Sequence, residues 1–518
     1  HINPVSFTQV EDPAIRNRII QTEAREKVIQ LNLQYHNIND YGSFKPHGFS
    51  IAIKPAPMEL YVDGKAMTIA RWPNEGRGMP IPEVIDPGSI PFNNDFSNRG
   101  GTFTYEYDRP KYWTRAKDIW LYGIFSAGYA DNNLGVDEID TSNRTIRTRH
   151  PDMFGIGETD TTSEWGPRFR YYIAYNLLEE IDEPGEYYID KNTGILYLYP
   201  PYDIRESDIS LSLSEEPLIT MENVSYNRIK GITLENGRQM GIYIEGGKNN
   251  TIDNCLVRGF GTLGIQLGKG IESPEYAIHE FTGELKSRMT GNMKAHIYQN
   301  SDFENDAGAG HRIINSRFFD LGSGAIILSG GDRKSLKPGN NLVENCEFER
   351  FNRWNKTYTP AIKLLGVGNK IRHCQISDSP HQVIAIKGNE HLIEFNRIEE
   401  AVKYFHDQGA IYIGRNPSER GNIIRYNYFG NIGKDGQKNC AIHLDDGASD
   451  VTIFGNVFYK ASRSDFGDIL INGGSKNLIQ NNIFIKGAHT LWIENGGGDL
   501  PPEQMKETRK CPQWQTGQ

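Results

Sequence analysis

Long apolar segments are missing from this sequence, and cysteines are few and scattered. No run of 18 apolar residues occurs in the 518-residue chain, so we expect no helix that spans a membrane. The five cysteines show neither zinc-ligand spacing nor a disulfide framework, and no regular calcium loop is present. The sequence therefore predicts no metal site and no cofactor, while a structural calcium ion stays open.

Positive charge is also in short supply. The formal net charge is −10, whereas a nucleic-acid partner calls for a basic surface, so we expect no such partner. Glycine, in contrast, is abundant at 54 residues, and glycine with frequent asparagine predicts many short strands joined by turns. The chain starts at His1, and we expect a secreted, periplasmic or cell-surface protein whose signal peptide has been removed.

The second half of the chain repeats a six-residue pattern. Ile or Val comes first, Asn, Cys or Ser stands fourth, and an apolar residue stands sixth. The copies are IKGITL at 229 (the weakest), IDNCLV at 252, IINSRF at 313, VENCEF at 343, IRHCQI at 371, IEFNRI at 393, IRYNYF at 424, IFGNVF at 453 and IQNNIF at 479. Irregular spacing around a fixed apolar core is typical of a solenoid with variable loops.

A second short apolar segment follows each copy. Examples are AIKLL at 361, VIAIK at 383, AIYIG at 410, AIHLD at 441 and LWIEN at 491. Two short strands per repeat, separated by Asn and Gly, predict an all-β fold, a right-handed parallel β-helix in which each coil stacks on the last. The Asn side chains would then bond along the axis, and Cys255, Cys346 and Cys374 would be small residues in the same position.

The first part of the chain lacks this repeat. Residues 9 to 33 have the spacing of one or two short helices, and Asp63-Gly64 and Asn192-Thr193-Gly194 mark turns between strands. We therefore expect a mainly-β domain over 1–205 packed on a β-helix over 206–518. An insertion near 270–310 interrupts the repeat, and we expect it or the N-terminal domain to wall a cleft.

Strand alternation predicts which side chains face outward from the stack. One outward row would hold Lys363, Ala385, Tyr412, His443, Leu470 and Trp492, and the adjacent row Leu365, Lys387, Gly414, Asp445, Asn472 and Glu494. A long outward face with Trp492 and Tyr412 suits an extended sugar polymer, because both are linear repeats.

Acids flank these rows. Asp407 and Asp465 precede their strands, and Asp445 and Asp446 follow theirs. Paired carboxylates hydrolyse glycosides, with one protonating the leaving oxygen and the other activating water or attacking the sugar. On a straight strand, seven positions separate Asp407 from the level of Asp445, about 23 Å. The turn before the strand must therefore fold Asp407 back.

The sequence resembles the β-helix proteins of glycoside hydrolase family 141 and their bacterial relatives. The resemblance rests on PAPMELYVDGKAMTIARWPNEG at 55, LLEEIDEPGEYYIDKNTGILYLYPP at 177, HDQGAIYIG at 406 and IHLDDGASD at 442. It implies hydrolysis of plant-type glycans, fucosidase- or xylanase-like, by two aspartates. By motif these are Asp407 and one of Asp445 and Asp446.

We therefore expect a glycosidase with a carbohydrate substrate. Around the acids, we expect the substrate to be bound by side chains bordering the rows, namely His406, Tyr412, His443, Lys363, Lys387, Arg415, Asp465, Glu494 and Trp492. A polysaccharide lyase is the first alternative, because Lys363, Lys387, Arg415, Tyr412 and His443 could support β-elimination on a uronic acid. A glycan-binding solenoid without catalysis is the second.

Overall fold

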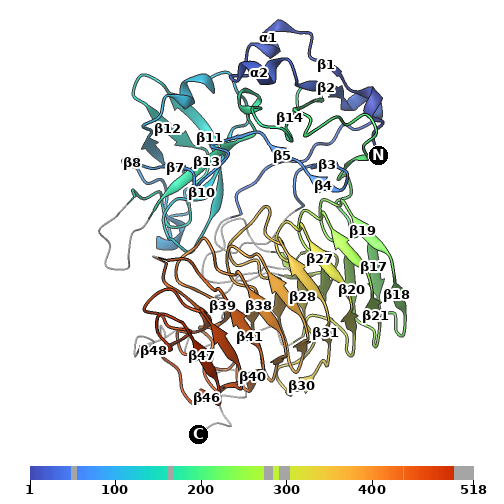
Figure 1. Cartoon of the computed structure of the whole chain (residues 1–518), viewed down its shortest axis with the longest axis vertical. Helices are drawn as coiled ribbons and strands as arrows, with labels where there is room; N and C mark the ends of the chain where they lie inside the picture. The colour runs from blue at the N-terminus through green and yellow to red at the C-terminus, as the bar shows by residue number, and fades with distance from the viewer. Residues whose placement is uncertain (48–54, 160–168, 273–283, 291–303, 436, 495–518) are drawn as a thin grey trace. The chain divides into compact units, whose positions relative to one another are not determined.

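The computed structural model describes residues 1–47, 55–159, 169–272, 284–290, 304–435 and 437–494 (Figure 1). The chain folds into two compact units. They are His1–Phe49 with Ala56–Leu213, and Ser50–Pro55 with Ser214–Gln518.

The first unit is mainly β, as predicted. It contains the short helices α1 (Pro13–Arg16) and α2 (Thr22–Arg25), both inside the segment expected to be helical. One sheet has the order β1 (Thr8–Gln9), β2 (Ile29–Asn32), β15 (Ile195–Leu198), β14 (Glu186–Asp190), β5 (Thr68–Ile69). A larger sheet has the order β6 (Arg71–Trp72), β13 (Tyr171–Tyr175), β10 (Trp120–Ile124), β11 (Asn132–Asp140), β12 (Thr145–Thr148), β9 (Thr102–Thr104), β8 (Val84–Asp86), and β7 (Met79–Pro80) pairs with β13.

Both predicted turns join antiparallel strands. The third sheet of this unit has the order β16 (Ile209–Leu211), β3 (Leu60–Val62), β4 (Lys65–Ala66). Between β3 and β4, Asp63 and Gly64 have φ values of 50° and 71°, the left-handed pair that a tight hairpin turn requires. The Asn192 turn is a longer loop, residues 191–194, that joins β14 to β15 with Gly194 left-handed at a φ of 69°.

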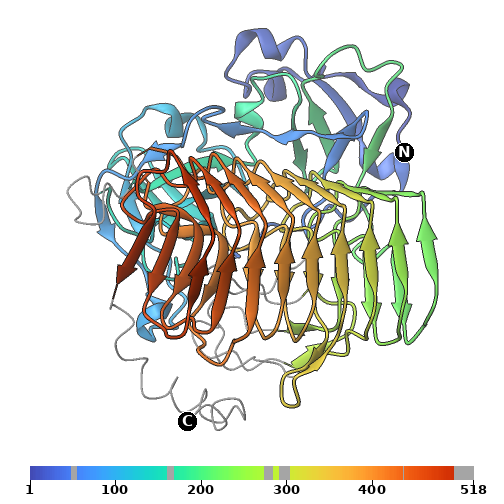
Figure 2. The ribbon, with the colours of Figure 1, turned by 60° about the horizontal axis from the view of Figure 1, so that its bottom comes forward.

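The second unit is a parallel β-helix, as the repeat predicts. Figure 2 shows its coils stacked side by side. The first of its long sheets, which we call the outward sheet, comprises β17 (Ile219–Glu222), β20 (Ile242–Glu245), β23 (Ile265–Leu267), β28 (Ile326–Leu328), β33 (Ile362–Leu364), β36 (Ile384–Ile386), β39 (Gln408–Gly414), β42 (Asn439–Asp445), β45 (Ile469–Asn472) and β48 (Leu491–Glu494).

Two further long sheets complete each coil, so the expectation of two strands per repeat is wrong: each six-residue pattern bends in its middle and contributes to two strands. The second comprises β18 (Arg228–Lys230), β21 (Thr251–Asp253), β26 (Arg312–Ile314), β31 (Leu342–Glu344), β34 (Lys370–Arg372), β37 (Leu392–Glu394), β40 (Asn422–Arg425), β43 (Val451–Phe454) and β46 (Leu478–Gln480). The third comprises β19 (Thr233–Glu235), β22 (Leu256–Arg258), β27 (Arg317–Phe319), β32 (Glu347–Glu349), β35 (Gln375–Ser377), β38 (Arg397–Glu399), β41 (Tyr428–Gly430), β44 (Val457–Tyr459) and β47 (Ile483–Ile485).

The six-residue pattern marks the bend between the second and third sheets. There the backbone N–H of Asn396 donates to Asn427 Oδ1 at 3.0 Å, that of Asn427 to Asn456 Oδ1 at 2.9 Å, and that of Asn456 to Asn482 Oδ1 at 2.8 Å. Cys374 joins the same ladder, since its N–H donates to Asn396 Oδ1 at 2.9 Å. The predicted asparagine ladder is confirmed, and it satisfies backbone groups that the bend removes from the sheets.

The insertion begins with a short hairpin, β24 (Gly270–Glu272) and β25 (Glu284–Lys286). Much of it, residues 273–283 and 291–303, lies outside the described residues. A second hairpin, β29 (Gly331–Asp332) with β30 (Lys337–Pro338), leaves the stack between β28 and β31. The expectation that the insertion walls a cleft stays a prediction.

Candidate functional site

The outward rows lie where alternation predicted them. In the outward sheet, Lys363 pairs with Ala385, Ala385 with Tyr412, Tyr412 with His443, His443 with Leu470 and Leu470 with Trp492. In the adjacent row Gly414 pairs with Asp445 and Asn472 with Glu494. Ile411 and Ile413 belong to the hydrophobic core, and Tyr412 between them does not.

Near Asp407 the chain departs from a straight strand, because β39 bends inside its own length rather than in the turn before it. Ala410 and Ile411 both face the core, although successive residues of a straight strand face opposite sides, so β39 turns a corner at Ala410. Asp407 itself is left-handed, with a φ of 59°, and its N–H donates to Lys438 O at 2.8 Å on the next coil. The 23 Å separation of a straight strand therefore does not apply.

Asp445 is buried and surrounded by hydrogen-bond donors. The Tyr412 hydroxyl donates to its Oδ2 at 2.6 Å, and the Asn472 amide donates to its Oδ1 at 3.2 Å. Arg415 Nε lies 3.4 Å from Oδ2, and His443 Nε2 lies 3.5 Å from Oδ1. Three hydrogen-bond donors thus converge on the two oxygens of Asp445, with the His443 ring beside them.

Asp446 shares two of these partners. Arg415 Nε lies 2.9 Å from its Oδ2, and the Asn472 amide donates to its Oδ1 at 2.9 Å. Burial and the neighbouring charge of Asp445 raise the pKa of Asp446. Its side chain is 28 % exposed against 11 % for Asp445, so the second acid of the pair is the one nearer solvent.

Asp407 and Asp445 lie close enough to interact electrostatically. Part of Asp407 is exposed, but the surrounding protein displaces much of the water near its carboxyl. This desolvation raises the pKa of the carboxyl. The charges of Asp445 and Glu494 raise it further, against the opposing effects of His443 and Arg415. Repulsion between two carboxylates favours keeping one protonated and the other ionised.

His443 takes part in the same cluster. Burial alone would lower the pKa of His443, but the carboxylates of Asp445, Asp407 and Asp446 raise it above its ordinary value. Its ring meets that of Tyr412 edge-on, with centroids 5.4 Å apart. Tyr412 is 1 % exposed, so its ring is covered and its hydroxyl is committed to Asp445. Tyr412 therefore supports Asp445 and offers no open surface on which a sugar ring could stack.

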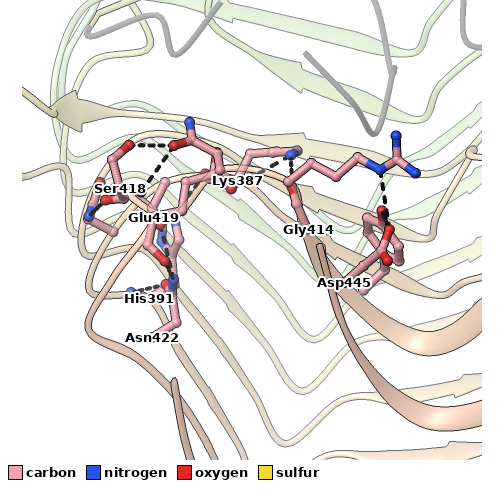
Figure 3. Close-up of polar contacts among 12 residues, drawn as sticks. Lys387, His391, Gly414, Ser418, Glu419, Asn422 and Asp445 are labelled. Carbon is pink, nitrogen blue, oxygen red and sulfur yellow. Dashed lines mark hydrogen bonds and ion pairs between the residues drawn. The ribbon is translucent and has the colours of Figure 1, made fainter. Parts of the chain in front are cut away.

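The two predicted lysines occupy a second, basic part of the face, which we call the lysine cluster: Lys363, Lys387, Arg333 and Glu419. Lys387 Nζ donates to Gly414 O at 2.7 Å and lies 3.6 Å from Glu419 Oε2 (Figure 3). Burial, together with Arg333 and Arg415, lowers the pKa of Lys387 despite Glu419. Burial and the charge of Lys387 lower the pKa of Lys363 even further.

The remaining predicted residues lie at the margins. Trp492 is 37 % exposed, at the last described coil, and Glu494 is half-buried and acts on Asp407 through its charge. His406 is half-buried beside Asp407 in the chain, and Asp465 is exposed. The geometry thus brings together Asp445, Asp446, His443, Tyr412 and Arg415, and Asp407 is linked to them through its charge.

Sequence reasoning missed three supporting residues. Asn472 was placed in the outward row, but its bonds to both Asp445 and Asp446 were not expected. Arg333 and Glu419 come from loops outside the repeat, where nothing in the sequence pattern indicates a place on the face. In the part of the chain that the structure describes, His, Cys, Asp and Glu form no group of three suited to a metal ion. The described residues likewise contain no helix long and apolar enough to cross a membrane.

Comparisons with known proteins support the fold. A family model described as a right handed beta helix region matches residues 297–484. A solved structure described as a glycoside hydrolase aligns over 93 % of this chain and 82 % of its own, with a TM-score of 0.59 at 12 % identity. A complex of XylC with xylose covers 93 % of this chain and 74 % of its own at 10 % identity, but its TM-score of 0.39 carries no weight. No curated protein matches the chain.

The second unit is therefore a right-handed parallel β-helix, and most of the chain is similar in fold to a protein described as a glycoside hydrolase. At 12 % identity the likeness concerns the fold alone.

Proposed function

We propose that this protein is a glycoside hydrolase that acts on a complex glycan, of plant type or similar, on the outward face of its β-helix. The observation that carries the proposal is the buried carboxyl of Asp445, bonded to Tyr412 and Asn472 beside Arg415 and Asp446, whose charge also acts on Asp407. Two carboxyls in unlike surroundings are what acid–base cleavage of a glycosidic bond needs. The likeness to a glycoside hydrolase structure and to family 141 motifs supports the same reaction class. Because such polymers are met outside the cell, we also propose a secreted or cell-surface location.

The surroundings assign a role to each acid. The raised pKa of Asp407 suits the general acid, which protonates the glycosidic oxygen as the bond breaks. Asp445 accepts three hydrogen bonds and lies beside His443, which suits the ionised partner that attacks the sugar or takes a proton from water. Asp446 is the rival for that second role, because it shares Arg415 and Asn472 and is more exposed.

The experiment is a panel of plant and bacterial glycans with product analysis. A new reducing end without ultraviolet absorption at the non-reducing end identifies hydrolysis. Asp407→Asn and Asp445→Asn should each lower turnover by about three orders of magnitude or more, since each removes a group that reacts. Asp435→Asn, at an exposed acid outside the site, is the matched control. Near-normal turnover in Asp407→Asn would refute the pair.

A polysaccharide lyase is the second candidate, because of one observation. Lys387, Tyr412 and His443 lie on or directly after strands of the same sheet as Asp445, and side chains of these kinds can remove the proton next to a uronate carboxyl. The same panel separates the reactions, since β-elimination leaves a conjugated double bond in the product. Binding without any product would instead indicate a glycan-binding solenoid.

A further inference from the structure

One corner of the β-helix is built from glycine except beside the acids. It follows the outward strands, and its residue has a positive φ on each coil from Gly330 to Gly473. Extending the register of the outward sheet by one or two residues gives this glycine column as Gly330, Gly366, Gly388, Arg415, Asp446 and Gly473, with φ values of 122°, 82°, 114°, 66°, 35° and 74°. Side chains thus replace glycine on two adjacent coils, at Arg415 and Asp446.

The glycine column differs from the other corners, where side chains occur on coil after coil. At the bend between the second and third sheets, the left-handed residues include Asn345, His373, Phe395 and Tyr426. In the glycine column the coils approach more closely. A Cβ on Gly388 would lie 2.1 Å from Gly366 O, and a Cβ on Gly366 would lie 2.2 Å from Gly330 O. This corner therefore favours glycine, and a side chain in it calls for a reason.

Arg415 contacts both acids at the end of β42. Its Nε lies 2.9 Å from Asp446 Oδ2 and donates to Asp445 Oδ2 at 3.4 Å. On the other side, the Asn472 amide donates to Asp445 Oδ1 at 3.2 Å and to Asp446 Oδ1 at 2.9 Å. One guanidinium and one amide thus hold two like charges side by side. Without the cation the two carboxylates would repel each other, and the orientation of Asp445 would be less fixed.

A purely structural ion pair does not explain this arrangement. The Arg415 side chain is 38 % exposed, and ion pairs at such positions add little stability because water and salt screen them. A side chain at a left-handed position costs as much or more. Glycine at 415 with an uncharged residue at 446 would avoid both the strain and the repulsion. The chemistry of the acids therefore explains Arg415 better than the stability of the corner does.

The charge of Arg415 also reaches the proposed general acid. Burial raises the pKa of Asp407 and that of Asp446, and Arg415 opposes the rise in both. The titratable and charged groups that act on Arg415 or on these acids are Lys387, Asp407, Tyr412, His443, Asp445, Asp446 and Glu494. His443 changes its own charge with pH, whereas an arginine stays positive. Arg415 thus supplies these acids with a constant positive charge.

We propose that Arg415 is a positioning residue of the proposed reaction, which orients the Asp445 carboxyl beside Asp446 and fixes through its charge the pH range of turnover. The inference rests on the proposed function and adds a residue that acts through the acids rather than on the sugar. It differs in this from the expectation that Arg415 binds substrate. Loss of the guanidinium should therefore lower kcat and leave KM nearly unchanged.

The test compares four variants with the wild type on xylan and fucosylated xyloglucan oligosaccharides and on any other glycan of the panel that is cleaved. Arg415→Gly should lower kcat about 10- to 100-fold, because a misplaced reacting group loses about that much. Guanidinium chloride at millimolar concentration should restore part of that turnover, since the vacated position is open to solvent. In thermal melts Arg415→Gly should be more stable than Arg415→Ala, because only glycine takes this φ without strain.

The pH profile separates charge from shape. In Arg415→Gln the loss of a positive charge raises the pKa of both working acids. The ionised partner then loses its proton at higher pH, and the general acid keeps its proton to higher pH, so both limbs of the kcat profile should move upward. Arg415→Lys keeps the charge and should keep the wild-type profile, although its kcat falls because lysine lacks the planar guanidinium.

Arg350 is the matched control. It is also left-handed, with a φ of 47°, and its side chain is 48 % exposed. Its guanidinium likewise meets two acids, at 2.7 Å from Asp320 Oδ1 and 3.1 Å from Glu349 Oε2, but it follows β32 of the third sheet. Arg350→Gly and Arg350→Gln should keep the wild-type kcat and pH profile, and guanidinium should not change their turnover.

The outcomes separate the inference from the proposed function. Wild-type kcat in Arg415→Gly, or a rise in KM alone, would refute the positioning role and leave the proposed hydrolase intact. Equal losses in the Arg415 and Arg350 variants, without rescue by guanidinium or a shifted profile, would show that Arg415 supports only the fold. If the wild type turns over no glycan, the proposed function fails, and the inference with it.

Discussion

The asparagine ladder makes a strong prediction about stability at Asn427, which is 1 % exposed. Its amide donates to Ile393 O and to Asn456 Oδ1, both at 3.0 Å. Its Oδ1 accepts from the N–H and the side-chain amide of Asn396, at 3.0 and 2.9 Å. Asn427→Ala removes all four bonds and leaves the buried N–H of Asn396 without that acceptor.

The magnitude follows from those contacts. A net hydrogen bond contributes about 1 kcal/mol, and a buried group left unsatisfied costs about 1–3 kcal/mol, so Asn427→Ala should lower stability by about 3–5 kcal/mol. Asn427→Ser should lose about half as much, because a serine hydroxyl still accepts the backbone N–H. Ser316 does so in the same position, with Cys255 N 3.1 Å from its Oγ.

Urea unfolding followed by circular dichroism, with calorimetric melting as a second measure, tests this order. Asn482→Ala is the matched control, because Asn482 stands at the last described rung and is only part-buried, so its loss should be the smallest. Equal losses for Asn427→Ala and Asn427→Ser, or losses below about 1 kcal/mol, well under the value of the four bonds, would refute the reasoning.

Three further predictions concern single side chains. Tyr412→Phe removes the 2.6 Å bond to Asp445, so kcat should fall about 10- to 100-fold with little change in melting temperature, and Tyr404→Phe should change neither. Trp492→Ala should raise KM several-fold and leave kcat intact, since an exposed ring contributes about 1 kcal/mol of stacking; an unchanged KM would remove it from the site. Asp468 is 1 % exposed, neither carboxyl oxygen has a hydrogen-bond partner among the described residues, and burial raises its pKa to about 6. A raised acid pKa means that the fold loses stability as pH rises from about 4 to 6, so Asp468→Asn should be more stable by about 2–3 kcal/mol at pH 8 and equal at pH 4. A pH-independent difference between the two proteins in thermal melts would contradict that reasoning.

The β-helix and its register could be predicted because both depend on local patterns. Alternation fixes which side of a strand faces the core, and stacking fixes which residues are neighbours, so the row from Lys363 to Trp492 followed from the sequence. The ladder at Asn396, Asn427 and Asn456 followed from the repeat for the same reason.

The electrostatic effect of Asp445 on Asp407 could not be worked out from alternation, because it depends on a corner in β39. The sequence did contain a signal for such corners. An alanine precedes the core-facing isoleucine at Ala361, Ala410 and Ala441, and all three alanines face the core. Burial of Lys363 and the support from Arg333 and Glu419 depend on loops without a repeat, where sequence spacing carries no positional information.

Because each coil supplies one residue to each outward row, the β-helix can vary its surface one coil at a time. Ile362, Ile384, Ile411 and Ile442 are equivalent positions on successive coils. Deleting residues 362–383 would remove one coil and join residue 361 to Ile384, which occupies the position of Ile362 on the next coil. Lys363 would be lost, while Lys387, Tyr412 and both flanking acids would keep their order. Excising 411–441 would instead remove Tyr412 and Arg415 and place Asp407 on the same strand as Asp445. A change confined to one coil therefore alters one position in each row and leaves the positions of the other coils as they were.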